Sequence, residues 1–238
     1  MQLKNKKIAI MQPTYLPWIG YFNLIYKSDI FVFLDSVQLA KRSWQVKNKI
    51  KSSNGELFLA VPIQKTNTRD KLLICESKIA YNVNWVEKHL KSIRHSYSKS
   101  YFFNEVYCIL EEGLQSNFIT LPDLNISLIK KISNMLNIET EFINSSKLKD
   151  INGKKDEILI SICKKLNAGK YISPEGSKKY IESGNNLFVK NNIGLEYHDY
   201  KHPIYQQLYG NFISHLGIID ILFNLGFTKC EKIVKEIN

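Results

Sequence analysis

The hydrophobic positions of this chain form short continuous runs separated by longer stretches with helical spacing. Continuous apolar runs at residues 8–11 and 30–34 predict strands covered on both faces, and the stretch that begins at Ile19 predicts a helix of about ten residues between them. Because parallel neighbours need a crossover connection, this strand, helix and strand predict a parallel unit.

The same alternation continues to the end of the chain. Further strands are predicted at residues 57–63, 72–79, 140–143, 170–173 and 195–200. Helices are predicted at residues 83–97, 103–114, 122–136, 155–166 and 216–224, and a short basic helix is predicted after Gly226. The pattern predicts one α/β domain over residues 1–238, with a predominantly parallel Rossmann-like sheet, helices on both faces and a helical insertion at about 83–136.

Composition excludes several classes of protein. The chain has 238 residues and 44% hydrophobic composition, enough for a large core. No apolar run approaches the roughly 20 residues that span a bilayer, so we expect a cytoplasmic protein without membrane insertion. The four cysteines show no CxxC spacing and no histidine at ligand distance, so we expect small core residues, with neither a disulfide framework nor a metal site.

The net charge of +11 is the feature that suggests an anionic partner. Only three of the 33 basic residues are arginines: Arg42, Arg69 and Arg94. Specific recognition of phosphates and bases favours the planar guanidinium group, so the composition favours an anionic small molecule over nucleic acid.

The loop after the first predicted strand is the first candidate site, because ligands of parallel α/β sheets bind at the carboxyl ends of strands. Two prolines, Pro13 and Pro17, fix its backbone at low entropic cost. Gln12, Tyr15 and Trp18 add an amide, a phenol and an indole that suit substrate binding. Packing beneath a turn is the alternative role for the aromatic residues. We also expect a close approach at Gly20.

The second candidate site follows the second predicted strand. Asp35 ends that strand, and the polar or aromatic residues Gln38, Lys41, Arg42 and Trp44 follow it closely. Such a cluster suits a phosphate or nucleotide sugar, with Arg42 as a bidentate clamp and Asp35 as a catalytic base or a ribose contact. A solvated ion pair is the alternative for Lys41.

Gly176, Ser177 and Lys178 open a predicted short helix after a strand. Free backbone N–H groups and a lysine at that point are suited to hold a phosphate, although an ordinary turn is the alternative.

Two further segments carry candidate residues. His202 follows another strand end, with Tyr205 and Gln207 nearby, so His202 is a candidate general base on an attacking amine. A hydrogen bond from its ring to a neighbouring carbonyl group is the alternative. His89 is a candidate lining residue, and Asp220 lies among apolar residues where a carboxylate needs a partner.

Several blocks of the sequence resemble the WbqC-like family. The blocks are Gln12-Pro13-Thr14-Tyr15-Leu16-Pro17-Trp18-Ile19-Gly20-Tyr21-Phe22, Phe31-Val32-Phe33-Leu34-Asp35-Ser36-Val37-Gln38, Lys41-Arg42-Ser43-Trp44, residues 85–93, residues 169–176, His202-Pro203-Ile204-Tyr205-Gln206-Gln207 and Leu222-Phe223-Asn224. Together they cover nearly the whole chain. Many relatives carry histidine before the Gln-Pro pair, where this chain has Met11.

The resemblance implies a transferase of bacterial surface-polysaccharide, or O-antigen-like, biosynthesis. Family members are associated with passing glycine or another small acyl group to an amino sugar, which implies a nucleotide-linked or lipid-linked acceptor and an acyl or aminoacyl donor. A free amino acid would need ATP with magnesium, whereas an acyl carrier or an aminoacyl-tRNA would not. Cofactor, donor and oligomeric state stay open.

Two other functions fit the same residues. The order of strand, proline-containing loop and helix resembles the HxGH nucleotidyltransferases and the pantothenate-synthetase-like ligases, but the chain has no HxGH motif. A non-catalytic module that binds glycan precursors is the other alternative, since the aromatic loop suits sugar stacking.

Overall fold

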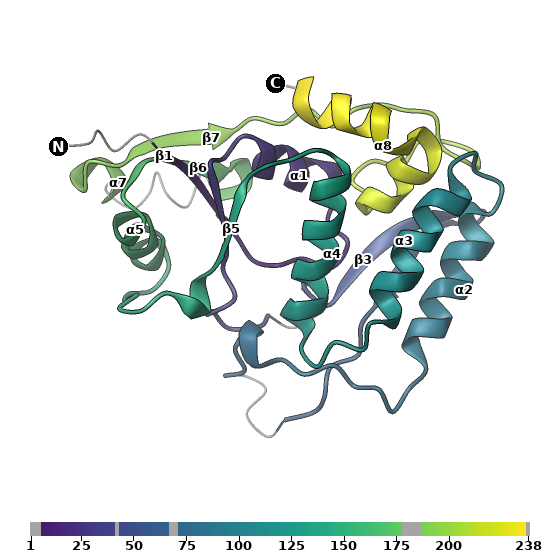
Figure 1. The fold of residues 1–238 in the computed structure, drawn as a ribbon, viewed down its shortest axis with the longest axis horizontal. Helices are drawn as coiled ribbons and strands as arrows, with labels where there is room; N and C mark the ends of the chain where they lie inside the picture. The colour runs from purple at the N-terminus through teal and green to yellow at the C-terminus, as the bar shows by residue number, and fades with distance from the viewer. Residues whose placement is uncertain (1–5, 41–42, 67–70, 178–186, 237–238) are drawn as a thin grey trace.

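The computed structural model of the protein describes residues 6–40, 43–66, 71–177 and 187–236, which form an α/β fold around one parallel sheet (Figure 1). The strands are β1 (Lys6–Met11), β2 (Ile30–Phe33), β5 (Glu141–Asn144), β6 (Ala168–Pro174) and β7 (Gly194–His198). Their order is β5-β2-β1-β6-β7, and every neighbouring pair is parallel. The predicted fold class is confirmed.

Helices cover both faces of this sheet, as the sequence predicted (Figure 1). They are α1 (Ile19–Tyr26), α2 (Trp85–Tyr97), α3 (Phe103–Gln115), α4 (Leu121–Met135), α5 (Asp156–Lys165), α7 (Leu187–Lys190) and α8 (Ile218–Glu236). Helices α1, α4 and α8 pack on one face, and α5 and α7 pack on the other.

The continuous apolar runs of β1 and β2 arise because each of these two strands contributes to two cores. Ile8 and Ile10 of β1 face α5 and α7, whereas Ala9 between them faces the core that contains α1. Phe31 and Phe33 of β2 point to that second core, where their rings lie 5.3 Å apart. Successive side chains of a strand point to opposite faces, so neither face has a polar position.

The predicted helical insertion forms α2, α3 and α4, and its core is continuous with the sheet. Ile93 of α2, Leu110 of α3 and Ile129 of α4 belong to the same buried cluster as Phe31 of β2. This continuity supports the proposal that the chain is one domain.

The segment from 47 to 79 differs from the prediction. A hairpin of β3 (Lys47–Ser52) and β4 (Gly55–Ala60) forms a separate antiparallel sheet. The predicted strand at 72–79 is wrong: Ile74–Glu76 is a turn of 3₁₀-helix. Its backbone joins the segment after β2 instead, since the Cys75 N–H donates to the Asp35 carbonyl oxygen.

Helix α8 contains the break that was predicted at Gly226. Gly226 has φ +74°, and a Cβ there would lie 2.6 Å from the Phe102 ring. Only glycine combines this left-handed conformation with so close a contact, so the residue separates the two halves of the helix.

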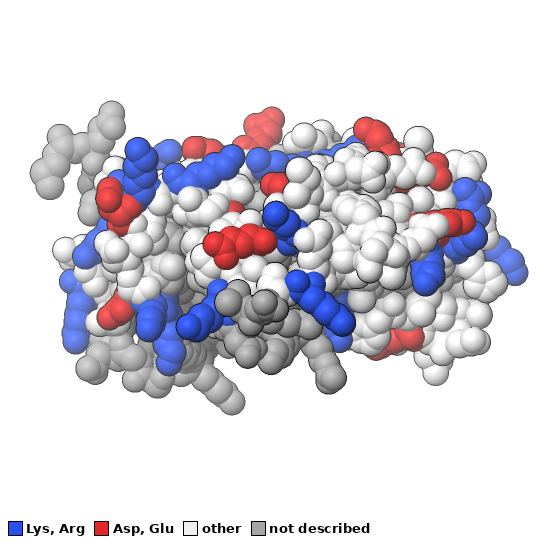
Figure 2. Space-filling model, turned by 90° about the horizontal axis from the view of Figure 1, so that it is seen from below, with Lys and Arg blue, Asp and Glu red and all other residues white. Residues whose placement is uncertain are grey.

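The charged surface is mixed rather than segregated. On the face shown in Figure 2, Lys and Arg side chains are spread out with Asp and Glu side chains among them. Over the described ranges, no helix has the length and apolarity needed to cross a membrane, and no group of three or more His, Cys, Asp or Glu residues could hold a metal ion. All four cysteines are free; Cys163 and Cys230 are buried, Cys75 is half-buried, and Cys108 is exposed, contrary to the expectation of a core residue.

Candidate functional site

The strand order places a site at the carboxyl ends of β1 and β6. The chain builds outward from β1 through β2 to β5, then returns to the other side of β1 to form β6 and β7. At such a reversal the loops that follow the two central strands diverge and leave a crevice for ligands. The loops here are residues 12–18 after β1 and the 3₁₀ turn Glu175–Ser177 after β6.

A cavity of about 330 Å³ opens at the carboxyl end of β1. Its lining comes from β1, the following loop, α1, β3 and the segment before α8. The lining residues are Met11, Thr14, Trp18, Tyr21, Trp44, Asn48, Lys49 and His215. Two indole rings therefore share a cavity with an amide, an ammonium group and an imidazole.

Two buried asparagines hold the loop after β1. The Asn48 side-chain N–H₂ donates to the carbonyl oxygens of Tyr15 at 3.0 Å and Leu16 at 2.8 Å. The Asn125 side-chain N–H₂ donates to the carbonyl oxygens of Pro13 at 3.0 Å and Gln45 at 2.9 Å. Leu16 has φ +43°, so these bonds stabilise a conformation that non-glycine residues rarely adopt.

Gly20 allows the Trp18 indole to form one wall of the cavity. A Cβ on Gly20 would lie 2.2 Å from Cη2 of that ring, so only glycine leaves room for the indole over the start of α1. The close approach predicted at Gly20 is confirmed. The ring also meets Tyr200 edge-on, with centroids 5.2 Å apart.

Two histidines pack against Trp18. The His202 ring is parallel to the indole at 5.9 Å between centroids, and the His215 ring lies 4.8 Å from the indole and 4.6 Å from His202. Both nitrogens of His202 are engaged: Nδ1 lies 2.8 Å from the Pro203 carbonyl oxygen, and the His215 N–H donates to Nε2 at 3.0 Å. Since Pro203 offers only an acceptor, the geometry assigns the proton to Nδ1 and leaves a neutral ring.

His215 faces the cavity directly. It is an exposed residue with φ +58°, and the cavity wall beside it includes Lys49. Partial burial, followed by the charge of Lys49, lowers the pKa of His215 below its ordinary value. The Lys49 ammonium is itself paired with Glu56 at 2.5 Å.

Asp35, the other predicted catalytic residue, lies at the end of β2 in a saturated set of hydrogen bonds. Its carboxylate accepts from the Ser145 hydroxyl, from the N–H and hydroxyl of Ser146, and from the Asn144 amide, at 2.7–3.2 Å. The residue is only 2% exposed. This geometry ties β2 to the turn after β5 and favours a structural role over that of a base.

Tyr205 and Gln207 do not line the cavity; they lie in the segment before α8 and bond to that helix. The Tyr205 hydroxyl donates to the Asp220 carboxylate at 2.8 Å and the Gln207 amide donates to it at 3.0 Å, while Tyr97 donates to its other oxygen at 2.7 Å. These are the partners that a buried carboxylate at position 220 was expected to need. They also anchor the segment that carries His202 and His215.

The other predicted residues that the structure describes do not line the cavity, and their places are as follows. Gln12 accepts from Gln45 at 2.6 Å beside the cavity, whereas Tyr15 and His89 bond each other at 3.0 Å in the core. Gln38 is exposed and bridges to Leu73, and Gly176 and Ser177 lie in the turn after β6. Lys41, Arg42 and Lys178 lie outside the described residues.

The comparison with protein families decides the identity of the chain. The model of the WbqC-like protein family matches residues 12–232. The chain belongs to the WbqC-like family. It is 32% identical to an uncharacterized protein of Mycobacterium tuberculosis over 224 residues, which cover 93% of this chain and 94% of that protein. No solved structure matches the chain.

Asn48, Lys49 and His215 are among the cavity residues of this WbqC-like chain that sequence reasoning did not predict, as are Thr14 and Tyr21. The first two lie on β3. This strand was not predicted because its buried positions include the polar residues Asn48 and Lys51. His215 precedes a helix without any motif around it. Met11, where the family resemblance leads us to expect histidine, lines the same cavity.

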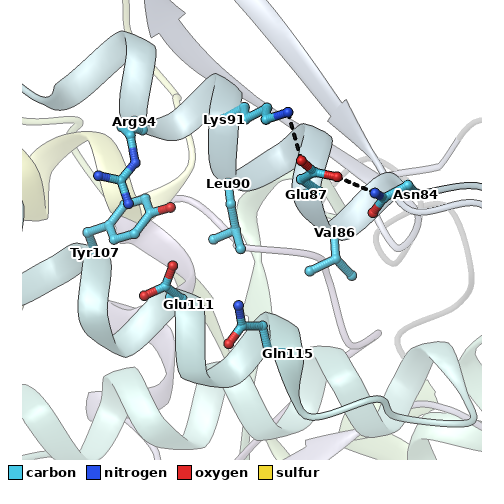
Figure 3. A pocket seen from close by; sticks show the side chains of 9 residues that line it. All are labelled: Asn84, Val86, Glu87, Leu90, Lys91, Arg94, Tyr107, Glu111 and Gln115. Atoms are coloured by element: carbon cyan, nitrogen blue, oxygen red, sulfur yellow. Dashed lines mark hydrogen bonds and ion pairs between the residues drawn. The ribbon is translucent and has the colours of Figure 1, made fainter.

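A second hollow, of about 440 Å³, lies between α2 and α3 (Figure 3). Three of its charged groups have partners: Glu87 pairs with Lys91 at 2.7 Å and bonds Asn84, and the Arg94 guanidinium lies 4.5 Å above the centre of the Tyr107 ring. This hollow is a groove between packed helices, remote in the fold from the carboxyl ends of the strands.

Proposed function

We propose that this WbqC-like protein transfers glycine or another small acyl group to the amine of a nucleotide-linked amino sugar, in the cytoplasmic steps of bacterial surface-polysaccharide synthesis. The observation that carries the proposal is the cavity at the end of β1, which combines two indole walls with a histidine at the position where α/β sheets bind ligands.

The indole walls suit a sugar ring. Trp18 is held in place by its neighbours, whereas Trp44 is 51% exposed and stacks on Phe58 at 6.5 Å between centroids. A large ring left exposed at a cavity mouth suits stacking against the apolar face of a sugar. The volume of about 330 Å³ is at the lower end of small-molecule sites, which fits a single sugar unit.

The turn after β6 suits the phosphates of such an acceptor. Gly176 is exposed at the carboxyl end of β6, and a Cβ there would meet no atom of the described residues within 4 Å. Ser177 adds a hydroxyl group. Lys41, Arg42 and Lys178 stay predictions as anionic contacts, based on their positions in the sequence.

The donor must be activated, because amide formation from a free carboxylate in water is unfavourable. An acyl-carrier thioester and an aminoacyl-tRNA ester both meet this need, and glycine with ATP and magnesium would meet it if the protein activates the acid itself. The net charge of +11 favours any of these anionic donors.

A product assay tests the proposal. The purified protein is incubated with nucleotide-linked amino sugars and, separately, with a glycyl thioester, glycyl-tRNA or glycine plus ATP and magnesium. We expect mass spectrometry to find a sugar nucleotide heavier by one glycyl residue. An N-acetylated sugar without a free amine is the matched control and should remain unchanged. Absence of product with every donor would contradict the proposal.

The exposed Trp44 also fits a second function, a module that binds glycan precursors without reacting with them. Under that alternative, nucleotide-linked amino sugars would stabilise the protein while no donor gave product.

A further inference from the structure

We propose that His215, rather than His202 or Asp35, is the base that accepts the proton of the attacking amine, and that His202 positions it. This inference rests on the proposed transferase function and names the catalytic group of the same cavity.

The position of the His215 ring is the first argument. The ring lines the cavity, and two other rings, Trp18 and His202, hold it from behind at 4.8 and 4.6 Å between centroids. Among the residues that the structure describes, no hydrogen bond reaches its ring nitrogens. A base must have a nitrogen lone pair available within hydrogen-bond reach of the substrate.

The backbone of His215 is the second argument. A non-glycine residue at φ +58° is uncommon, and such conformations concentrate at functional sites. Here the cause is visible: the His215 N–H donates to Nε2 of His202, while Nδ1 of His202 is fixed by the Pro203 carbonyl oxygen. Both nitrogens of His202 are therefore engaged, Nε2 with the His215 N–H and Nδ1 with Pro203, and neither is available for substrate.

The protonation of His215 agrees with this role. The charged and titratable groups around it are His202, with a lowered pKa, and Lys49, whose ammonium is paired with Glu56. Partial burial and the Lys49 charge lower the pKa of His215 below 6.5. The imidazole is therefore neutral at pH 7 and can accept a proton.

The reaction is balanced without any further reagent. The neutral amine of the sugar attacks the carbonyl carbon of an acyl thioester or aminoacyl ester. A C–N bond forms and the C–S or C–O bond breaks. The proton lost by the amine passes to a ring nitrogen of His215 and then to the leaving thiolate or alkoxide, so the imidazole returns to its neutral form.

The test compares His215→Gln and His202→Gln, with the exposed His95→Gln on α2 as the matched control. For His215→Gln we expect kcat to fall by about 10²-fold or more, while the Kd for the sugar nucleotide changes by less than about threefold. The acid limb of the wild-type pH–rate profile should disappear in that variant. His202→Gln should lower kcat and leave the limb in place, as expected of a positioning residue. His95→Gln should match the wild type.

A second readout does not need turnover. In NMR spectra of the wild-type protein, a nucleotide-linked amino sugar should shift the ring signals of His215, and the N-acetylated sugar should shift them less. If the wild type makes product and His215→Gln keeps its kcat, the base assignment is wrong while the transferase function stands. If no donor gives product, the proposed function fails. If, in addition, the nucleotide-linked amino sugar does not shift the NMR signals of the His215 ring, this inference fails too.

Discussion

Asn48 and Asn125 show how single buried side chains shape the candidate site. Each donates to two backbone carbonyl groups in or beside the loop after β1, and each is at most 5% exposed. Polar groups buried in this way cost free energy unless every donor is satisfied. The loop is therefore fixed by side chains from β3 and α4, far away in the sequence.

Replacing Asn48 by alanine tests this role. The carbonyl groups of Tyr15 and Leu16 would lose their buried donor, so we expect the free energy of unfolding to fall by about 1–3 kcal/mol. Urea denaturation measures the change. Asn104→Ala, at an exposed position of α3, is the control and should shift stability by less than about 0.5 kcal/mol. Equal stabilities would show that the loop does not depend on Asn48.

Gly20→Ala tests the wall formed by Trp18. The new Cβ would overlap the indole, which must leave its place against Tyr200. We expect a red shift of tryptophan fluorescence and weaker binding of sugar nucleotides. Gly176→Ala, where a Cβ meets no atom within 4 Å, should leave the spectrum unchanged. An unaltered spectrum in Gly20→Ala would contradict the packing described for Trp18.

At this scale the sequence predicted the residues with strong local signals and missed those defined by distant contacts. The two prolines, Trp18 and Gly20 lie close together in the loop after β1 and the start of α1, so their type and spacing were sufficient. His215 enters the cavity only because the segment before α8 folds back to Trp18, a contact between positions about 200 residues apart. No local pattern encodes such a contact.

Among the elements, the strands of the central sheet were predictable because their apolar runs serve two cores. Strand β3 was not, since its buried positions include Asn48 and Lys51 beside Ile50. The Lys51 ammonium donates to the Asn211 carbonyl oxygen at 2.6 Å and to Gln207 at 3.1 Å. This strand is therefore polar because it holds the segment before α8 through hydrogen bonds.

Gln207 tests how that segment is anchored. Its amide bonds Asp220, the Ile213 carbonyl oxygen, the Ile213 N–H and Lys51. In Gln207→Ala we expect faster hydrogen exchange at the Ile213 amide and a stability loss of about 1–3 kcal/mol, because buried polar groups lose partners. The neighbouring Gln206→Ala, at an exposed position, is the matched control. Unchanged exchange at Ile213 would mean that the segment is held in another way.

For the whole molecule, buried neutral histidines predict how stability depends on pH. Burial lowers the pKa of His89 and of His198 to about 4, although no sequence pattern predicted that His198 is buried. The unfolded chain binds protons at about 6.5, so unfolding takes up protons between the two values. The contribution of these two histidines to the free energy of unfolding is therefore fully present above pH 6.5 and is lost as the pH drops towards 4.

His89→Gln isolates one of these contributions. Between pH 6.5 and 4, the free energy of unfolding of the variant should depend on pH less steeply than that of the wild type, by about 1.4 kcal/mol per pH unit. The reason is that the variant takes up one proton fewer on unfolding. Urea denaturation across that range measures the slope. His95→Gln should keep the wild-type slope, since His95 is exposed. If the free energy of unfolding of His89→Gln changed with pH as steeply as that of the wild type, His89 would not be held neutral.

The fold class of the whole molecule was the most predictable level, since a parallel sheet with helices on both faces follows from two-sided burial and parallel crossovers, whereas the strand order was not predicted. The ligand was the least predictable, because the cavity is assembled from three separate stretches of chain: residues 11–21, residues 44–49 and His215. Family membership covers residues 12–232 but names no substrate.

Ligand binding at Trp44 tests the central claim most directly. Thermal unfolding of the wild type and of Trp44→Ala is measured with nucleotide-linked amino sugars, and Tyr101→Ala, 92% exposed and outside the cavity, is the control. At a hundred times its Kd, a ligand adds about 2.7 kcal/mol to the wild type and to Tyr101→Ala. We predict that the ligand stabilises the wild type and Tyr101→Ala by this amount and does not stabilise Trp44→Ala. Equal stabilisation of all three proteins, or none in the wild type, would contradict the assignment of this cavity as the sugar site.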